Sequence, residues 1–100
     1  MTLKSEDVSI LERKFSIYLL LEIEKNPGRS KLDVISSEST GLRTKTVRIN
    51  ELIEAGLIYV ENGKRFNADN LFLTKKGKDI TTKLKKIRYI LLNENYENDE

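Results

Sequence analysis

The chain has 100 residues, a formal net charge of +2 and 38% hydrophobic residues. This length suits one domain, and the apolar content is too high for a disordered chain. The sequence has no cysteine and no histidine, which excludes disulfides and disfavours a zinc site. No apolar run approaches the roughly 18 residues of a membrane span, and the N-terminus lacks the order of a signal peptide. We therefore expect a cytoplasmic protein without cofactor, metal or membrane association.

Charge is distributed unevenly along the chain. Residues 29–88 carry fourteen basic and seven acidic side chains, whereas residues 89–100 carry four acidic and no basic ones. A basic central part favours a polyanionic partner, but lysine is also a general solubilising residue, so charge alone leaves both interpretations open. We expect one domain over residues 1–93, followed by a disordered acidic tail over residues 94–100.

The first element is a predicted helix that begins at Ser5, an N-cap residue, and ends at Asn26-Pro27-Gly28. Apolar residues recur at helical spacing from Val8 to Ile23. Further apolar residues spread around this helix, which is then either buried centrally or in contact with a partner on a second face. Complete burial is difficult in so small a domain, so we favour the second contact.

A short second helix is predicted over about residues 31–38, with Ser30 as its N-cap. Leu32 and Ile35 are expected to face the core, and a turn at residues 39–41 follows. Leu42 is expected to be buried after that turn.

The third helix is predicted over about residues 44–55, with Gly56 as its C-terminal stop. Its inner stripe comprises Ile49, Leu52 and Ile53. Helical geometry then directs the opposite positions outward and places Arg48 and Asn50 on the flanks. The outward set is Arg43, Thr44, Val47, Glu51 and Glu54.

A β-hairpin over about residues 58–74 is predicted next, with a type I′ turn at Asn62-Gly63. Residues 67–70 interrupt the return strand, so we expect an irregular hairpin. Thr74 caps the last helix. Apolar residues of that helix recur at steps of four, three and four, which suits either a coiled-coil seam or packing on its own domain.

Two segments resemble winged helix-turn-helix transcription regulators, particularly small archaeal and bacterial repressors of the MarR and ArsR kind. These are Glu51-Leu-Ile-Glu-Ala-Gly-Leu-Ile58 and Leu73-Thr-Lys-Lys-Gly77, in the right order and separation. The likeness covers about residues 8–92. It implies an α+β, mainly α fold with a three-helix core, a β-hairpin wing and a long C-terminal helix. It also implies DNA binding by the third helix and the wing, and dimerisation through the terminal helices.

The sequence departs from this pattern in two ways. Many relatives carry an apolar residue at the position of Lys45, so either the third helix begins later here or Lys45 lies at its entrance and reaches solvent. The metal-sensing cysteines and histidines of some ArsR relatives are absent, which gives no support to regulation by a metal.

The candidate DNA contacts follow from what the major groove presents. Arg48 suits guanine, Asn50 suits adenine and Val47 suits a thymine methyl group. The full candidate set is Ser30, Lys31, Arg43, Thr44, Lys45, Val47, Arg48, Asn50, Lys64 and Arg65. The alternatives are a solvated helix face, plain capping at Ser30 and an edge strand protected by charge.

The candidate dimer interface combines the surplus apolar residues of the first helix with the seam of the last. Its members are Ile10, Ile17, Leu20, Leu21, Ile80, Leu84, Ile87 and Leu91. The leading hypothesis is a homodimeric transcriptional regulator that binds double-stranded DNA sequence-specifically, with its third helix in the major groove.

Two rival hypotheses use the same scaffold: a protein-interaction module and a non-specific architectural DNA-binding protein. No catalytic constellation stands out, so we do not expect an enzyme. No residue pattern marks an effector pocket, and a small-molecule effector stays unknown.

Overall fold

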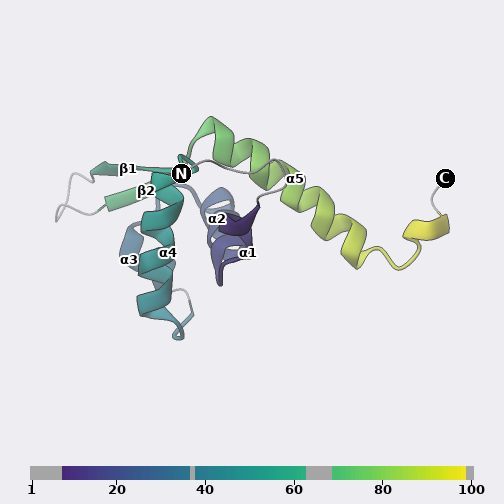
Figure 1. The fold of residues 1–100 in the computed structure, drawn as a ribbon, viewed down its shortest axis with the longest axis horizontal. Helices are drawn as coiled ribbons and strands as arrows, with labels where there is room; N and C mark the ends of the chain where they lie inside the picture. The colour runs from purple at the N-terminus through teal and green to yellow at the C-terminus, as the bar shows by residue number, and fades with distance from the viewer. Residues whose placement is uncertain (1–7, 37, 63–68, 99–100) are drawn as a thin grey trace.

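A computed structural model of the chain describes residues 8–36, 38–62 and 69–98 (Figure 1). Five α-helices and a two-stranded antiparallel sheet occur in these residues. In chain order the elements are α1 (Ser9–Glu12), α2 (Ser16–Lys25), α3 (Lys31–Ile35), α4 (Leu42–Glu54), β1 (Ile58–Asn62), β2 (Asp69–Leu73) and α5 (Lys75–Leu92), followed by a 3-10 turn, Tyr96–Asn98. The predicted fold class is confirmed.

The first predicted helix is divided in two. Ser5 lies outside the described residues, α1 ends at Glu12 with Arg13 in an extended conformation, and Phe15, just before α2, has a φ of 72°. A non-glycine residue rarely adopts this left-handed conformation. The ring of Phe15 lies against Gly41, where a Cβ would overlap it, so tertiary packing interrupts a helix that periodicity predicts as continuous. The predicted end is correct: α2 stops at Lys25, before Asn26-Pro27-Gly28.

Helix α3 is shorter than predicted, and it buries a different residue. Val34 is the buried side chain, whereas Leu32 is 69% exposed, so the expectation that Leu32 faces the core is wrong. The cap is as predicted, because the Ser30 hydroxyl accepts a hydrogen bond from the Asp33 N–H at 3.1 Å. With only one turn of helix, the chain direction set by this cap decides which side chain points inward.

Helix α4 begins at Leu42, earlier than predicted, with Gly41 as its N-cap. Leu42 is exposed rather than buried. The inner stripe is as predicted, since Ile49 and Leu52 are fully buried and Ile53 packs on the core. At the C-terminus Gly56 has φ 78°, and the N–H groups of Gly56 and Leu57 bond to carbonyls of the last turn, which is a Schellman ending.

The sheet pairs β1 and β2 from Ile58↔Leu73 to Asn62↔Asp69. The predicted turn at Asn62-Gly63 is wrong at Asn62, which is still in the ladder and pairs with Asp69. The predicted break at residues 67–70 is wrong in part, since Asp69 and Asn70 belong to β2. Residues 63–68 lie outside the described residues.

The two segments that resemble winged-helix regulators are bonded to one another. The Thr74 hydroxyl donates to the Gly56 carbonyl at 2.6 Å, and the Thr74 N–H donates to the Leu57 carbonyl at 3.1 Å. The same hydroxyl caps α5 by accepting from the Gly77 N–H at 3.0 Å. One threonine therefore joins the end of α4 to the start of α5, which explains why the two segments occur together.

The core lies where α2, α4, the sheet and the first half of α5 meet (Figure 1). Its buried apolar residues are Leu19, Leu20, Ile23, Val34, Ile49, Leu52, Leu57, Ile58, Leu71, Leu73 and Leu84. The second half of α5 leads away from this body and ends in exposed apolar residues. In the described part of the chain no helix is long and apolar enough to cross a membrane.

Candidate nucleic-acid interface

Helix α4 presents a narrow exposed stripe opposite its buried face. Arg43, Val47, Asn50 and Glu54 are exposed at steps of four, three and four, so they lie in one line along the helix. Val47 is 48% exposed, so its methyl groups are accessible on the outer face of the helix. The stripe combines one cation, one methyl-bearing side chain, one amide and one carboxylate, groups that suit the edges of base pairs.

Lys45 does not belong to this stripe. The structure buries it completely, with 0% exposure, so the expectation that it reaches solvent at the helix entrance is wrong. Its Nζ lies 5.1 Å from the ring centre of Phe15 and 5.2 Å from that of Tyr18, and donates to the Glu38 carbonyl at 3.3 Å. The physical reason is that α4 begins three residues before position 45, which turns Lys45 onto the stripe of Ile49 and Leu52.

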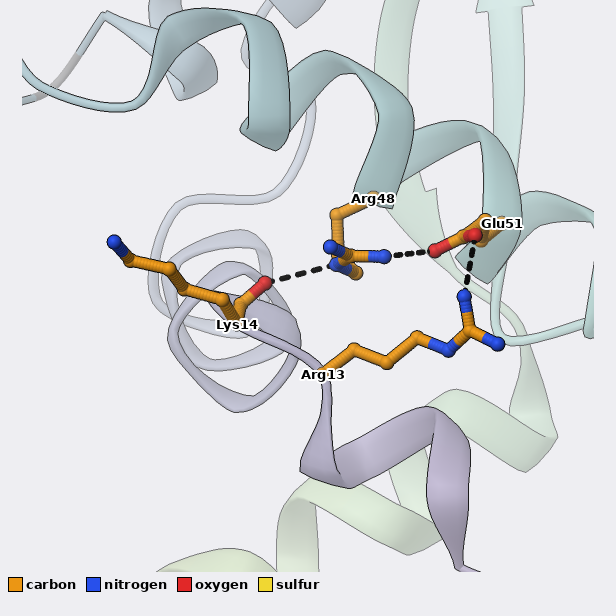
Figure 2. Close-up of polar contacts among 4 residues, drawn as sticks. All are labelled: Arg13, Lys14, Arg48 and Glu51. Carbon is orange, nitrogen blue, oxygen red and sulfur yellow. Dashed lines mark hydrogen bonds and ion pairs between the residues drawn. The ribbon is translucent and has the colours of Figure 1, made fainter.

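Arg48 and Glu51 form a charged network on one flank of α4 (Figure 2). The Arg48 Nε donates to the Lys14 carbonyl at 2.8 Å, and its Nη1 bonds to Glu51 Oε1. Arg13 reaches the other oxygen of Glu51, with Nη1 2.8 Å from Oε2. Only 12% of the Arg48 side chain is exposed, so in this arrangement its guanidinium is occupied by protein oxygens rather than presented outward. Glu51, predicted to point outward, lies at the centre of this network.

The start of α3 lies on the other side of α4. Lys31 Nζ donates to Asn50 Oδ1 at 3.1 Å, which brings two of the predicted DNA contacts together. Ser30 is occupied as the cap of α3, and Thr44 is half-buried. Lys64 and Arg65, the predicted contacts of the wing, lie outside the described residues. The described strands place the hairpin next to the C-terminal end of α4 (Figure 1).

The candidate dimer residues separate into two groups. Leu20 is fully buried and Leu84 is 7% exposed, so both belong to the core of this chain and the expectation that they lie on a contact face is wrong. Ile10, Leu21 and Ile80 are half-buried against the core. Ile17, Ile87 and Leu91 are exposed. Part of the surplus apolar surface of α2 is therefore buried against the core of its own domain.

Metal coordination finds no support in the described residues, where no three histidine, cysteine, aspartate or glutamate side chains gather. The polar side chains that do gather are the arginines and lysines around α4.

Comparison with known proteins gives a consistent result for the fold. No protein-family model and no curated protein matches the sequence. Among solved structures, an HxlR-family transcription factor from Thermoplasma volcanium has a TM-score of 0.73 at 20% identity, over 92% of this chain and 86% of that chain. FabT of Streptococcus pneumoniae, in complex with DNA, has a TM-score of 0.72 at 22% identity, over 95% of this chain and 71% of that chain.

A third neighbour is a mutant MarR from E. coli complexed with operator DNA, with a TM-score of 0.66 at 15% identity. The match covers 73% of this chain and 53% of the E. coli chain. The fold is a winged helix-turn-helix. In this winged helix α3 and α4 form the helix-turn-helix and β1 and β2 the wing, and structural neighbours with this fold are MarR, HxlR and SlyA regulators.

Sequence reasoning missed the contribution of residues 13 and 14 to the surroundings of α4. Arg13 lies 38 positions from its partner Glu51, a distance over which no sequence pattern predicts contact. The spacing of three between Arg48 and Glu51 was the one available signal, because residues three apart are neighbours on a helix.

Proposed function

We propose that this protein is a transcriptional regulator that binds double-stranded DNA as a homodimer, with α4 in the major groove. The observation that carries the proposal is the exposed stripe of Arg43, Val47, Asn50 and Glu54 on the second helix of a helix-turn-helix. That helix is the element that enters the major groove in this motif. Two of the structural neighbours, FabT and the mutant MarR, are complexes with DNA, which supports the same assignment.

We assign a role in DNA recognition to each side chain of the stripe. Asn50 suits adenine and Val47 a thymine methyl group, while Glu54 suits the amino group of cytosine and repels phosphate. Arg43, near the start of α4, reaches guanine or a phosphate. We assign Thr44, Ser30 and Lys31 to the DNA backbone, and we keep Lys64 and Arg65, the contacts predicted from the sequence of the wing, for phosphates or the minor groove. Lys45 and Arg48 leave the proposed set of base contacts, because protein groups already surround them.

The test is selection from a random duplex library at physiological salt, followed by affinity measurements on the enriched site. We expect an enriched pseudo-palindrome whose half-sites are about 34 Å apart. The double variant Val47→Ala/Asn50→Ala should lose base preference at the contacted positions, with a loss of about 1–3 kcal/mol for each good contact. Its affinity for random duplexes should stay unchanged.

A matched control is Lys83→Ala, which removes an exposed charge on α5 away from the stripe. Equal binding to all duplexes by the wild-type protein would favour the architectural alternative. Absence of binding at low salt, where phosphate contacts are strongest, would favour the protein-interaction module.

A further inference from the structure

Three consecutive residues at the joint between α1 and α2, residues 13–15, contact three side chains of α4. Phe15 lies under Lys45 Nζ at 5.1 Å, the Lys14 carbonyl accepts from Arg48 Nε at 2.8 Å, and Arg13 pairs with Glu51 at 2.8 Å. The three α4 residues, Lys45, Arg48 and Glu51, are spaced by three. They therefore run from the buried face of α4, where Lys45 lies, to the flank that carries Glu51, beside the exposed stripe and not within it.

These contacts fix the orientation of α4 relative to the joint more than they stabilise the fold. Arg48 uses different nitrogens for the Lys14 carbonyl and for Glu51, so its planar guanidinium spans two elements in one orientation (Figure 2). Arg13 is half exposed, and an ion pair at such a position contributes little to stability because water screens it. A network with little energy but defined geometry suits a role in positioning.

The joint is an unfavourable conformation that α4 holds in place. Phe15 adopts a left-handed backbone, which is strained in a non-glycine residue. The Ser16 hydroxyl is fully buried and finds no hydrogen-bond partner in the part of the chain that the structure describes. A strained residue and a buried polar group without a partner persist only where the surrounding structure holds them in place. Helix α2 also packs on α4 through the core, so the position of α1 and α2 relative to α4 is set by that packing together with the contacts of Lys45, Arg48 and Glu51.

We infer that Arg48 and Glu51 are positioning residues that set the angle between α4 and the α1–α2 joint, and thereby the spacing of DNA half-sites that the dimer accepts. The inference rests on the proposed function. If the terminal helices form the dimer contact, a change in the angle between α4 and the joint moves the two copies of α4 relative to one another. The distance between half-sites that the dimer prefers then depends on residues that contact no base.

The experiment is library selection with Glu51→Gln, which keeps the side-chain shape and removes the charge that both arginines share. We expect the wild-type bases within each half-site, a broader distribution of half-site separations, and an affinity for the wild-type site reduced about threefold to tenfold. Glu12→Gln is the matched control, because Glu12 is an exposed carboxylate at the end of α1, outside both the network and the proposed DNA contacts. It should leave the spacing unchanged.

A second variant, Arg13→Ala, tests the positioning role of the network without changing any residue of α4. It replaces Glu51→Gln in the experiment if that variant does not fold. It should broaden the spacing as Glu51→Gln does, and the dependence of affinity on salt should keep its slope. A slope reduced by about one with unchanged spacing would overturn the inference, because it would identify Arg13 as a phosphate contact.

Three other results would also overturn the inference. These are altered base identity in Glu51→Gln at an unchanged spacing, wild-type behaviour of both variants, and selection of a single unpaired half-site by the wild-type protein. Failure of the wild-type protein to select any sequence is a different result, because it contradicts the proposed function itself.

Discussion

At the residue scale, Lys45 is the most unusual side chain of the molecule. A fully buried ammonium loses its hydration, and here two aromatic rings and one carbonyl replace the water. Cation–π contacts of a desolvated ammonium contribute about 2 kcal/mol, whereas burial of a charge costs several. The aliphatic stem also fills core volume next to Ile49, a contribution that does not depend on the charge.

This balance predicts that Lys45→Met is tolerated. Methionine keeps most of the volume and its contact with the rings while removing the buried charge, and the Glu38 carbonyl is at an exposed residue where water can replace the lost donor. We expect a free energy of unfolding in urea within about 1 kcal/mol of wild type, or higher. The slope of DNA affinity against salt should also be unchanged. A slope smaller by about 0.9 would instead show that Lys45 binds a phosphate.

At the element scale, the start of α5 depends on Gly77. A Cβ at this position would overlap the carbonyl oxygen of Leu57, so only glycine lets the helix approach the end of α4 this closely. Gly77→Ala should lower the free energy of unfolding by about 3 kcal/mol, the upper part of the range for an overpacked interior. Thermal and urea unfolding measure this. Lys76→Ala, exposed in the same turn, is the control and should change little. Wild-type stability in Gly77→Ala would show that α5 can shift at no cost.

The elements differ in how far the sequence predicts them. Helix ends with local signals were predictable, as at Gly56 and Thr74, because capping depends on a few neighbouring residues. The break at Phe15 was not predictable, since its cause lies at Gly41 and Lys45 in another helix. The inner stripe of α4 was predictable from Ile49 and Leu52. The burial of Lys45 at the N-terminal end of that stripe was not, because lysine rarely occupies a core position.

The candidate interface shows the same division. Val47 and Asn50 could be placed on or near the outer face of α4 from helical periodicity alone. That Arg48 bonds to Lys14, and Glu51 to Arg13, depends on how α1 and α2 pack against α4, which periodicity does not contain. A charged side chain on a helix flank has the same sequence signature whether it faces DNA or another helix.

At the scale of the whole molecule, the last turns of α5, residues 87–92, carry apolar side chains that the described part of the chain leaves exposed. Ile87 is 51% exposed and Leu91 78%, and Tyr89, Ile90 and Leu92 are exposed beside them. Figure 1 shows this part of α5 leading away from the domain body. Contiguous exposed apolar residues of this kind mark interaction sites in soluble proteins. A second copy of α5 is the occupant that the proposed function requires.

We therefore predict that Leu91→Glu converts a dimer into a monomer in analytical ultracentrifugation, because a carboxylate in an apolar interface loses its hydration. Affinity for a palindromic site should fall by at least about 100-fold, since the two half-sites are then bound independently, while stability stays near wild type. Thr82→Glu, which adds the same charge at an exposed position nearer the body of the domain, should stay dimeric. A wild-type protein that sediments as a monomer at high micromolar concentration would contradict the dimer. A dimeric Leu91→Glu would move the interface from α5 to α1 and α2, where Ile17 is the exposed apolar residue to test next.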